Sequence, residues 1–276
     1  MVESGGPILR TLVRNEFCVS LMATPGCVDT MTNDPKNLIA PAPAIHAPST
    51  PQSDADWERM AAQLLELLIL HDQHSARALV IDAADNGVPF TEIYLKLIQP
   101  VMYRIGELWE CGSFDVAQEH YATAVIEMIL AHLEPEIFHG HSGRPAMIAA
   151  AVEGDLHVVG VRMVADFFEA DGWDTCYLGA NVPSTAIIAE SLRRKAKLIA
   201  LSASREANLP AVTQTIAAIH ESAALEGILV IVGGGLFKAR LHAADGIGAD
   251  GSAADARIAV EVARELMQAR EGEHSQ

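Results

Sequence analysis

Apolar runs of strand length alternate with helical segments through the second half of the chain, and this alternation most constrains the fold. Such alternation favours right-handed crossovers and a parallel sheet covered by helices on both faces. We therefore predict a doubly wound, flavodoxin-like α/β domain with five strands over residues 145–270, whose ligands bind beyond the carboxyl ends of the strands. The predicted strands are Met147–Val152, Thr175–Leu178, Leu198–Ser202, Ile228–Val232 and a short one near Gly248, with helices over residues 158–170, 184–195, 211–223 and 253–268.

Residues 53–140 show helical rather than strand periodicity. Ser53 is a suitable N-cap for a first helix, whose apolar residues recur from Trp57 to Leu68 at helical spacing. Three further helices are predicted over residues 74–86, 89–109 and 115–138, the second of these three bent at Pro100. Four helices with short connections predict an antiparallel four-helix bundle that precedes the sheet domain.

Residues 1–52 have the composition of a linker. Five prolines lie between Pro35 and Pro51, among Ala, Asn, Ser and Thr. Such a stretch buries little apolar surface, so we predict a disordered N-terminal arm. A short helix over Ile8–Met22 is the alternative for its first part.

The charge balance argues against several classes of function. The 276 residues carry a formal charge of −17, which disfavours direct binding to nucleic acid or to an anionic membrane. The basic run at residues 193–197 is interpreted as the solvated end of a helix. Four cysteines without CxxC spacing argue against a zinc site and suit a reducing cytoplasm. No apolar run is long enough to span a membrane.

The loop after the first predicted strand holds the strongest candidate for a metal ligand. Its sequence runs from Glu153 through Asp155 and His157 to Gly160. A histidine here could offer one ring nitrogen to a metal while Asp155 accepts a proton from the other and fixes the tautomer. Taken alone, a loop histidine is more often an ordinary surface residue.

Three short motifs occur in order at the predicted strand ends: Asp155-x-His157-x-x-Gly160, then Ser202, then Gly233-Gly234-Gly235. Together they resemble the cobalamin (B12)-binding domain of methionine synthase, B12-dependent mutases and corrinoid proteins. The resemblance implies that His157 ligates cobalt in place of the cofactor's dimethylbenzimidazole, whose nucleotide tail inserts beside the sheet. Ser204 stands where the family has Leu, which puts cofactor affinity in doubt. The implied contacts here are Glu153, Asp155, Leu156, His157, Val158, Val159, Gly160, Ser202, Ser204, Gly233, Gly234, Gly235 and Gly251.

A second match lies in the helical half. Trp109 is followed ten residues later by Glu119-His120, in a segment that includes Val116 and Thr123. This segment resembles the helical cap of the CarH and LitR type of B12 photoreceptor. That resemblance implies that Trp109, Val116, Glu119, His120 and Thr123 cover the upper face of the cofactor. Two features depart from that family. Residues 1–52 are too few and too rich in proline for its DNA-binding domain, and Glu110 replaces the histidine that captures cobalt after illumination.

These resemblances favour a stand-alone cobalamin sensor, of the AerR type, that is not an enzyme. It would bind adenosylcobalamin, or the hydroxo or methyl form, and signal to a transcription regulator or another signalling protein by rearranging its cap or a homo-oligomer. The main alternative is a corrinoid carrier that shuttles methyl groups between methyltransferases, although such carriers usually have Lys where this chain has Val161. A haem or bilin photosensor is a further alternative.

Overall fold

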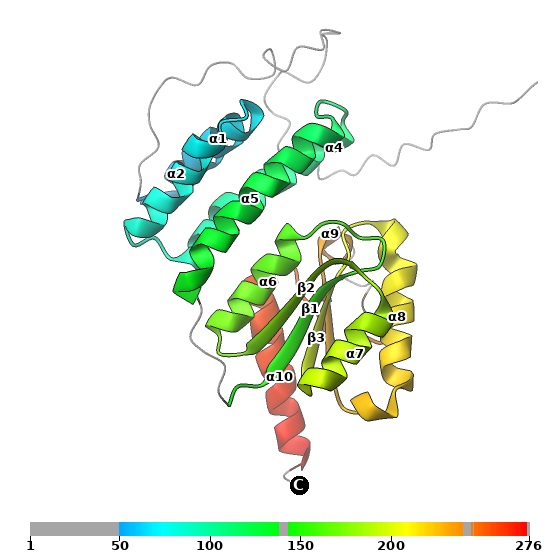
Figure 1. Ribbon diagram of the computed structural model, residues 1–276. Helices are drawn as coiled ribbons and strands as arrows, with labels where there is room; N and C mark the ends of the chain where they lie inside the picture. The colour runs from blue at the N-terminus through cyan, green and yellow to red at the C-terminus, as the bar shows by residue number, and fades with distance from the viewer. Residues whose placement is uncertain (1–49, 138–142, 240–243, 245, 275–276) are drawn as a thin grey trace, which may run out of the picture. The chain divides into compact units, whose positions relative to one another are not determined.

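The computed structural model describes residues 50–137, 143–239, 244 and 246–274. The predictions for residues 1–49, and the end of the predicted cap after residue 137, lie outside them. Within the described residues, no helix combines the length and the apolar character needed to cross a membrane. The helical cap consists of α1 (Asp54–Ile69), α2 (Gln73–Asp85), α3 (Phe90–Glu92), the π-helix η3 (Ile93–Ile98), α4 (Gln99–Glu110) and α5 (Val116–Ile137) (Figure 1).

The first two helices begin where short polar side chains satisfy free backbone N–H groups. The Ser53 hydroxyl accepts a hydrogen bond from the Asp56 N–H, and the Asp56 carboxylate accepts one from the Ser53 N–H, forming a capping box. Asp72 caps α2 through the Ser75 N–H at 3.0 Å. The predicted helix start at Ser53 is therefore confirmed.

The third predicted helix is continuous but contains a π-helical turn, which the sequence analysis did not predict. α3, η3 and α4 follow one another without a break from Phe90 to Glu110. Within η3 the hydrogen bonds reach back five residues, as from the Gln99 N–H to the Tyr94 carbonyl. Pro100 follows directly, and a proline has no N–H and its ring crowds the carbonyl four residues earlier. A widened turn before Pro100 accommodates that ring.

The sheet domain has the predicted doubly wound topology. Its five strands are all parallel and lie in the order β2-β1-β3-β4-β5, which is the flavodoxin-like order. The strands are β1 (Ala146–Val152), β2 (Asp174–Val182), β3 (Leu198–Ser202), β4 (Leu229–Gly233) and β5 (Gly251–Ser252), and the helices are α6 (Val159–Ala170), α7 (Ser184–Arg194), α8 (Leu209–Glu221), α9 (Gly235–Ala239) and α10 (Ala256–His274), with 3-10 turns η4 (Glu206–Asn208) and η5 (Ala223–Leu225).

Alternate residues of each buried strand enter two separate cores. Met147 and Ala149 of β1 pack in the core that holds α6, α10 and the cap helices, whereas Ile148 and Ala150 pack in the core formed with α7 and α8. Figure 1 shows α7 and α8 on one side of the sheet and α6 and α10 on the other. Two-sided burial explains why these strands are continuous apolar runs.

Three predictions about the sheet domain need correction. The fifth strand begins at Gly251 rather than near Gly248, because Gly248 has φ +82°, a left-handed conformation that is incompatible with a strand. β2 extends to Val182, and its register against β1 is irregular. The glycine run after β4 leads directly into the short helix α9. This helix was not predicted, because glycine has a low helix propensity.

Candidate cobalamin site

The loop after β1 turns sharply at the carboxyl end of the sheet. Gly154 has φ +81°, a left-handed conformation that favours glycine. Its N–H donates to the Asn181 side-chain oxygen at 2.7 Å, and the Asn181 N–H donates to the Asp155 carbonyl at 2.9 Å. Asn181, itself at φ +53°, ties the end of β2 to this loop. Sequence analysis missed Asn181, although an asparagine at a strand end is a recognised candidate for this conformation.

Asp155 is fully buried, and both of its carboxylate oxygens accept hydrogen bonds. Oδ1 accepts from the His157 N–H at 3.0 Å and lies 2.7 Å from His157 Nδ1, while Oδ2 accepts from the Ser204 N–H at 2.6 Å. Burial raises the pKa of Asp155, but these bonds from His157 and Ser204 outweigh burial and hold the pKa below its ordinary value. The side chain is therefore an ionised, fixed acceptor beneath His157.

His157 is half-exposed and oriented by Asp155. The hydrogen bond to Asp155 raises the pKa of His157, against the opposing effect of burial, and the negative charges of Asp155 and Glu119 add to the rise. Since Asp155 engages Nδ1, Nε2 is the nitrogen left to face a metal. This is the geometry expected of a histidine ligand whose tautomer is set by a carboxylate.

The loops after β3 and β4 pack so closely that only glycine fits between them. A Cβ on Gly234, which has φ +97°, would lie 2.4 Å from the Ala203 carbonyl oxygen, and one on Gly235 would lie 2.9 Å from the Ser204 carbonyl oxygen. Ser202 ends β3, and Gly233 ends β4 opposite it. These glycines thus hold the Ala203–Ser204 backbone in place, and Ser204 in turn contacts Asp155.

Two other predicted glycines have different surroundings. A Cβ on Gly160, near the start of α6, would meet nothing within 4 Å. Room for a ligand, rather than contact with the protein, is consistent with glycine there. A Cβ on Gly251 would lie 2.7 Å from Val262 Cγ1 of α10. Packing within the domain therefore explains Gly251 without a cofactor.

The predicted upper residues lie at the end of α4 and on the first turns of α5. Glu119 Oε2 lies 2.5 Å from His120 Nδ1, and Oε1 accepts the Thr123 hydroxyl at 3.0 Å. α5 packs against α6 of the sheet domain, and the Glu119 charge is among those that raise the pKa of His157. Trp109 lies at the end of α4 and Val116 begins α5.

Exposed apolar side chains occur on both parts of the predicted site. Trp109 is 37% exposed, Val116 56% and Leu156, beside His157, 65%. A large apolar side chain left in water is a candidate for contact with a ligand. A flat, apolar corrin face suits side chains of this kind, so their chemistry fits the cofactor. Glu153 and Val158 lie in the loop that carries His157, and Val159 is the first residue of α6.

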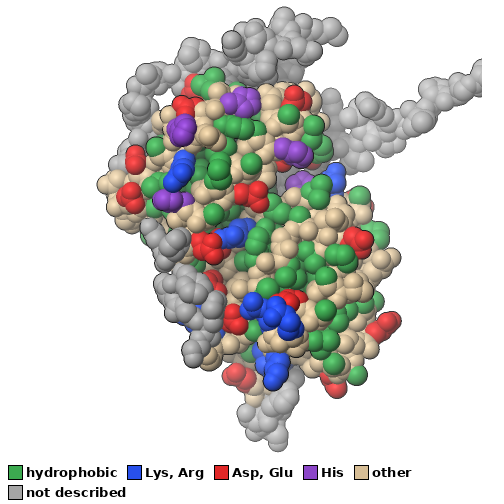
Figure 2. Space-filling model, viewed as in Figure 1, with side chains coloured by type: hydrophobic (Ala, Val, Ile, Leu, Met, Phe, Trp, Pro, Cys, Tyr) green, Lys and Arg blue, Asp and Glu red, His purple; other side chains and the backbone are tan. Residues whose placement is uncertain are grey.

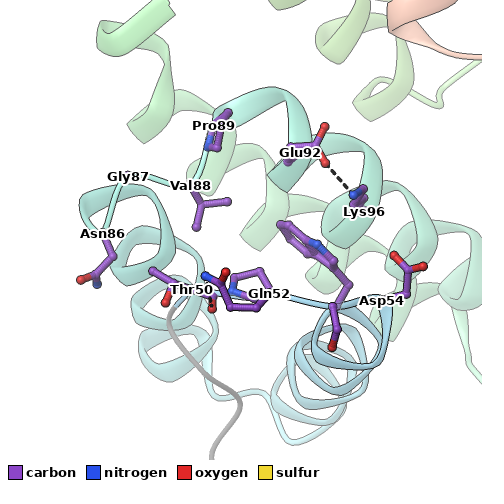
Figure 3. Close-up of a pocket in the computed structure, with 12 residues that line it drawn as sticks. Thr50, Gln52, Asp54, Asn86, Gly87, Val88, Pro89, Glu92 and Lys96 are labelled. Carbon is purple, nitrogen blue, oxygen red and sulfur yellow. Dashed lines mark hydrogen bonds and ion pairs between the residues drawn. The ribbon is translucent and has the colours of Figure 1, made fainter.

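The described cavities lie away from His157. One of about 360 Å³ lies in the cap, bordered by Trp57, the segment from Asn86 to Pro89, and Lys96. Figure 3 shows Lys96 paired with Glu92 there, at 2.8 Å. Another, of about 450 Å³, borders His220, Asp250 and Arg270 near the opposite end of the sheet. Neither contains a residue of the predicted site.

Histidine and arginine side chains gather elsewhere on the surface. Figure 2 shows histidines over the cap, where His71, His74, His120 and His132 are exposed. Within the described part of the chain, no three His, Cys, Asp or Glu side chains form a group able to hold a metal ion. Arg193 and Arg194 both pair with Glu190 at the end of α7, as expected of a solvated helix end.

Comparison with known proteins decides the family. Residues 145–263 match a family model described as a B12 binding domain, and residues 60–134 match a second B12 binding domain model. The chain is a B12-binding domain protein. This confirms the cobalamin-binding part of the sequence analysis and its two-part architecture. The haem and bilin alternatives find no support.

The similar proteins are named as corrinoid proteins. The monomethylamine corrinoid protein 1 of Methanosarcina mazei is 26% identical over 211 residues, which cover 74% of this chain and 96% of that protein. The dimethylamine corrinoid protein 1 of Methanosarcina acetivorans is 29% identical over 191 residues, covering 68% and 88%. The structure of the Methanosarcina barkeri monomethylamine corrinoid protein matches with a TM-score of 0.66 at 22% identity, over 76% of this chain and 99% of that one. These relatives do not support the photoreceptor interpretation.

Proposed function

We propose that this B12-binding domain protein is a corrinoid carrier, which exchanges methyl groups with separate methyltransferases and provides no substrate site of its own. The observation that carries the proposal is the match to corrinoid proteins over cap and sheet domain together, which spans nearly the full length of the Methanosarcina mazei relative. The fold alone would not distinguish a carrier from a sensor. Similarity extending through the cap supports the carrier, because the cap is the part that would cover the reactive side of the cofactor.

The residues present fit a corrinoid. His157 would hold it from below, with Nδ1 bound to Asp155 at 2.7 Å, and the exposed side chains of Leu156, Val116 and Trp109 would cover its faces. When bound, cobalamin supplies a cobalt centre that takes up and gives away a methyl group. The chain's part is to hold that centre, set its lower ligand through Asp155, and keep water from it with the cap.

The lower-ligand assignment is tested by the absorption spectrum of the protein loaded with cobalamin. We expect His157→Ala to shift the spectrum to that of a form without a protein ligand. His220→Ala is the matched control, because His220 borders the cavity near the opposite end of the sheet. An unchanged spectrum in His157→Ala would exclude His157 as the ligand.

A light or cofactor sensor is a second candidate, favoured by one feature of the cap. Glu119 and His120 are paired at 2.5 Å on α5, and Glu119 acts electrostatically on His157. These are the residues that the photoreceptor resemblance places around an adenosyl group. In this candidate, loss of the upper ligand rearranges the cap and changes assembly or binding to a regulatory protein.

One pair of measurements separates the two candidates. Protein loaded in the dark with adenosylcobalamin is exposed to green light, and its absorption and elution volume are compared before and after. A second sample receives a methyl donor and a corrinoid methyltransferase. The carrier predicts transfer of the methyl group and no lasting change of assembly in light. An irreversible spectral change with altered assembly, without methyl transfer, favours the sensor.

A further inference from the structure

Besides aromatic packing, three contacts of polar or charged side chains join the helix formed by α3, η3 and α4 to the sheet domain among the described residues, and they differ in burial. The Tyr94 hydroxyl donates to Asp166 Oδ2 of α6 at 2.8 Å, within the core. Glu92, two residues earlier, accepts from Arg257 of α10 at 2.8 Å. Further along the same helix, Lys238 Nζ of α9 lies 4.0 Å from the ring centroid of Tyr103, and both side chains are exposed.

The contact at Tyr94 belongs to a larger network that runs from the core to the surface. Arg162 Nε donates to Asp166 Oδ1 at 3.0 Å, and Arg162 Nη2 donates to Glu134 of α5 at 2.8 Å. Phe90 and Tyr94 also contact the ring of Phe167, at centroid distances of 5.4 and 6.2 Å. Two helices of the cap are thus fixed to α6 by charged, hydrogen-bonded and aromatic contacts together. Tyr94 and Asp166 are the buried members, and removing either one deprives the other of a hydrogen bond inside the core, which makes this region costly to open.

The contact at Lys238 has the opposite character. An exposed cation over an aromatic ring is weak and exchanges readily with water. α9 follows Gly233 and Gly234 at the carboxyl end of the sheet, where the loop of His157 also lies. Asp166 lies about two turns into α6, away from that end. The weak contact is therefore on the cofactor side of the interface.

We infer that Tyr94 and Asp166 are positioning residues that form the fixed pivot of the cap. Tyr103 and Lys238 form the contact that breaks when the cap moves. The continuous helix from Phe90 to Glu110 places Trp109 fifteen positions after Tyr94, on the order of 20 Å along its axis. A small rotation at the pivot is thereby enlarged at Trp109. This inference rests on the proposed function for its purpose, since either a methyltransferase or a signalling partner must reach the cofactor's upper face.

Hydrogen exchange on the cofactor-free full chain tests the pivot. Tyr94→Phe removes a hydroxyl and keeps the aromatic packing, so the protein should fold. We expect exchange in η3 and α6 to rise together, at least about tenfold, because a hydrogen bond to a carboxylate is lost. Asp166→Asn removes more, because the Arg162 Nε–H loses its charged acceptor while only one amide oxygen remains for the Tyr94 hydroxyl, so it should raise exchange in η3 and α6 at least as much as Tyr94→Phe. Unchanged exchange of α6 in Tyr94→Phe would overturn the pivot.

Tryptophan fluorescence tests the releasing contact. Of the three tryptophans, Trp57 and Trp173 are buried and Trp109 is exposed, so acrylamide quenching reports mainly on Trp109. We expect Lys238→Ala to increase quenching and to raise exchange over residues 103–110 while η3 and α6 stay unchanged. Lys238→Arg should restore both readings, and Trp109→Phe should abolish the change in quenching. If Lys238→Ala loosens η3 and α6 as much as residues 103–110, the two contacts are not distinct and the inference fails.

These outcomes are independent of the proposed function. Both measurements use protein without cobalamin, methyl donor or partner, so they report only the mechanics of the cap. A failed methyl-transfer assay would leave a pivot at Tyr94 standing. Conversely, an active carrier whose α6 does not respond to Tyr94→Phe would keep the proposed function and lose the pivot.

Discussion

Below the proposed cofactor position, both carboxylate oxygens of Asp155 accept hydrogen bonds, and the loops after β3 and β4 approach each other backbone to backbone. Above it, Trp109 and Val116 project into solvent from helix ends, and the pair Glu119–His120 is hydrogen-bonded chiefly to its own helix. The lower half is built by contacts within the sheet domain and needs no ligand to be defined. The upper half is left open. A B12-binding protein can therefore keep one lower half and vary its function through the cap.

The contrast between the two halves predicts that substitutions in the close-packed loops of the lower half destabilise the protein. Gly234→Ala should lower the free energy of unfolding by about 3 kcal/mol or more, because the new Cβ meets backbone and φ is strained. Gly160→Ala is the control within the same half. It should leave the stability of the cofactor-free protein equal or slightly higher by about 0.5 kcal/mol, as alanine favours helix, yet weaken cobalamin binding. Urea denaturation measures the free energy of unfolding, and titration with cobalamin measures binding. A stable Gly234→Ala protein would show that the loops need not approach so closely.

The next effect concerns the carboxylate beneath His157. Asp155→Ala leaves the Ser204 N–H without its acceptor and should cost about 2 kcal/mol of stability. The pKa of His157, raised by Asp155, should fall in this variant. Titration of the His157 ring by NMR in cofactor-free protein measures the pKa. If the midpoint is the same in both proteins, Asp155 does not set the state of the ring.

The same pair predicts the direction of the pH dependence. A histidine whose folded pKa is raised contributes stability that is full below its unfolded pKa and is lost as pH rises through the folded value. Asp155, with a lowered pKa, contributes stability above its unfolded pKa that is lost as pH falls through the folded value. Asp155→Asn should remove both contributions. Denaturation curves are recorded at about pH 3, 6 and 9, which lie below, between and above the ordinary pKa values of Asp and His. The free energies of unfolding of the wild type and of Asp155→Asn should differ most at the middle pH.

The sequence revealed the lower half better than the upper, for a physical reason. Asp155 and His157 lie two residues apart, and strand ends of a parallel sheet must meet at one edge, so spacing and topology place them. Segments far apart in sequence are joined by the network of Tyr94, Arg162, Asp166 and Glu134. The local sequence around each of these residues is typical of an ordinary helix and does not indicate the pairing. The π-helical turn that carries Tyr94 has no local signature besides Pro100. Long-range pairing of this kind needs the structure.

Among the destabilising substitutions, the smallest loss of stability should come from the upper half. Trp109→Ala removes a partly exposed side chain at a helix end, so the free energy of unfolding should change by about 1 kcal/mol or less. Retention of adenosylcobalamin should nevertheless fall more than that of hydroxocobalamin, because the bulkier upper ligand has more surface for the indole to cover. Dialysis of the two loaded forms side by side measures the ratio. Equal retention would make Trp109 a packing residue and would leave the Glu119–His120 pair as the feature of the cap that favours a sensor. A preferential loss would instead show that the open upper half selects among cofactor forms, which a carrier for a small methyl group has little need to do.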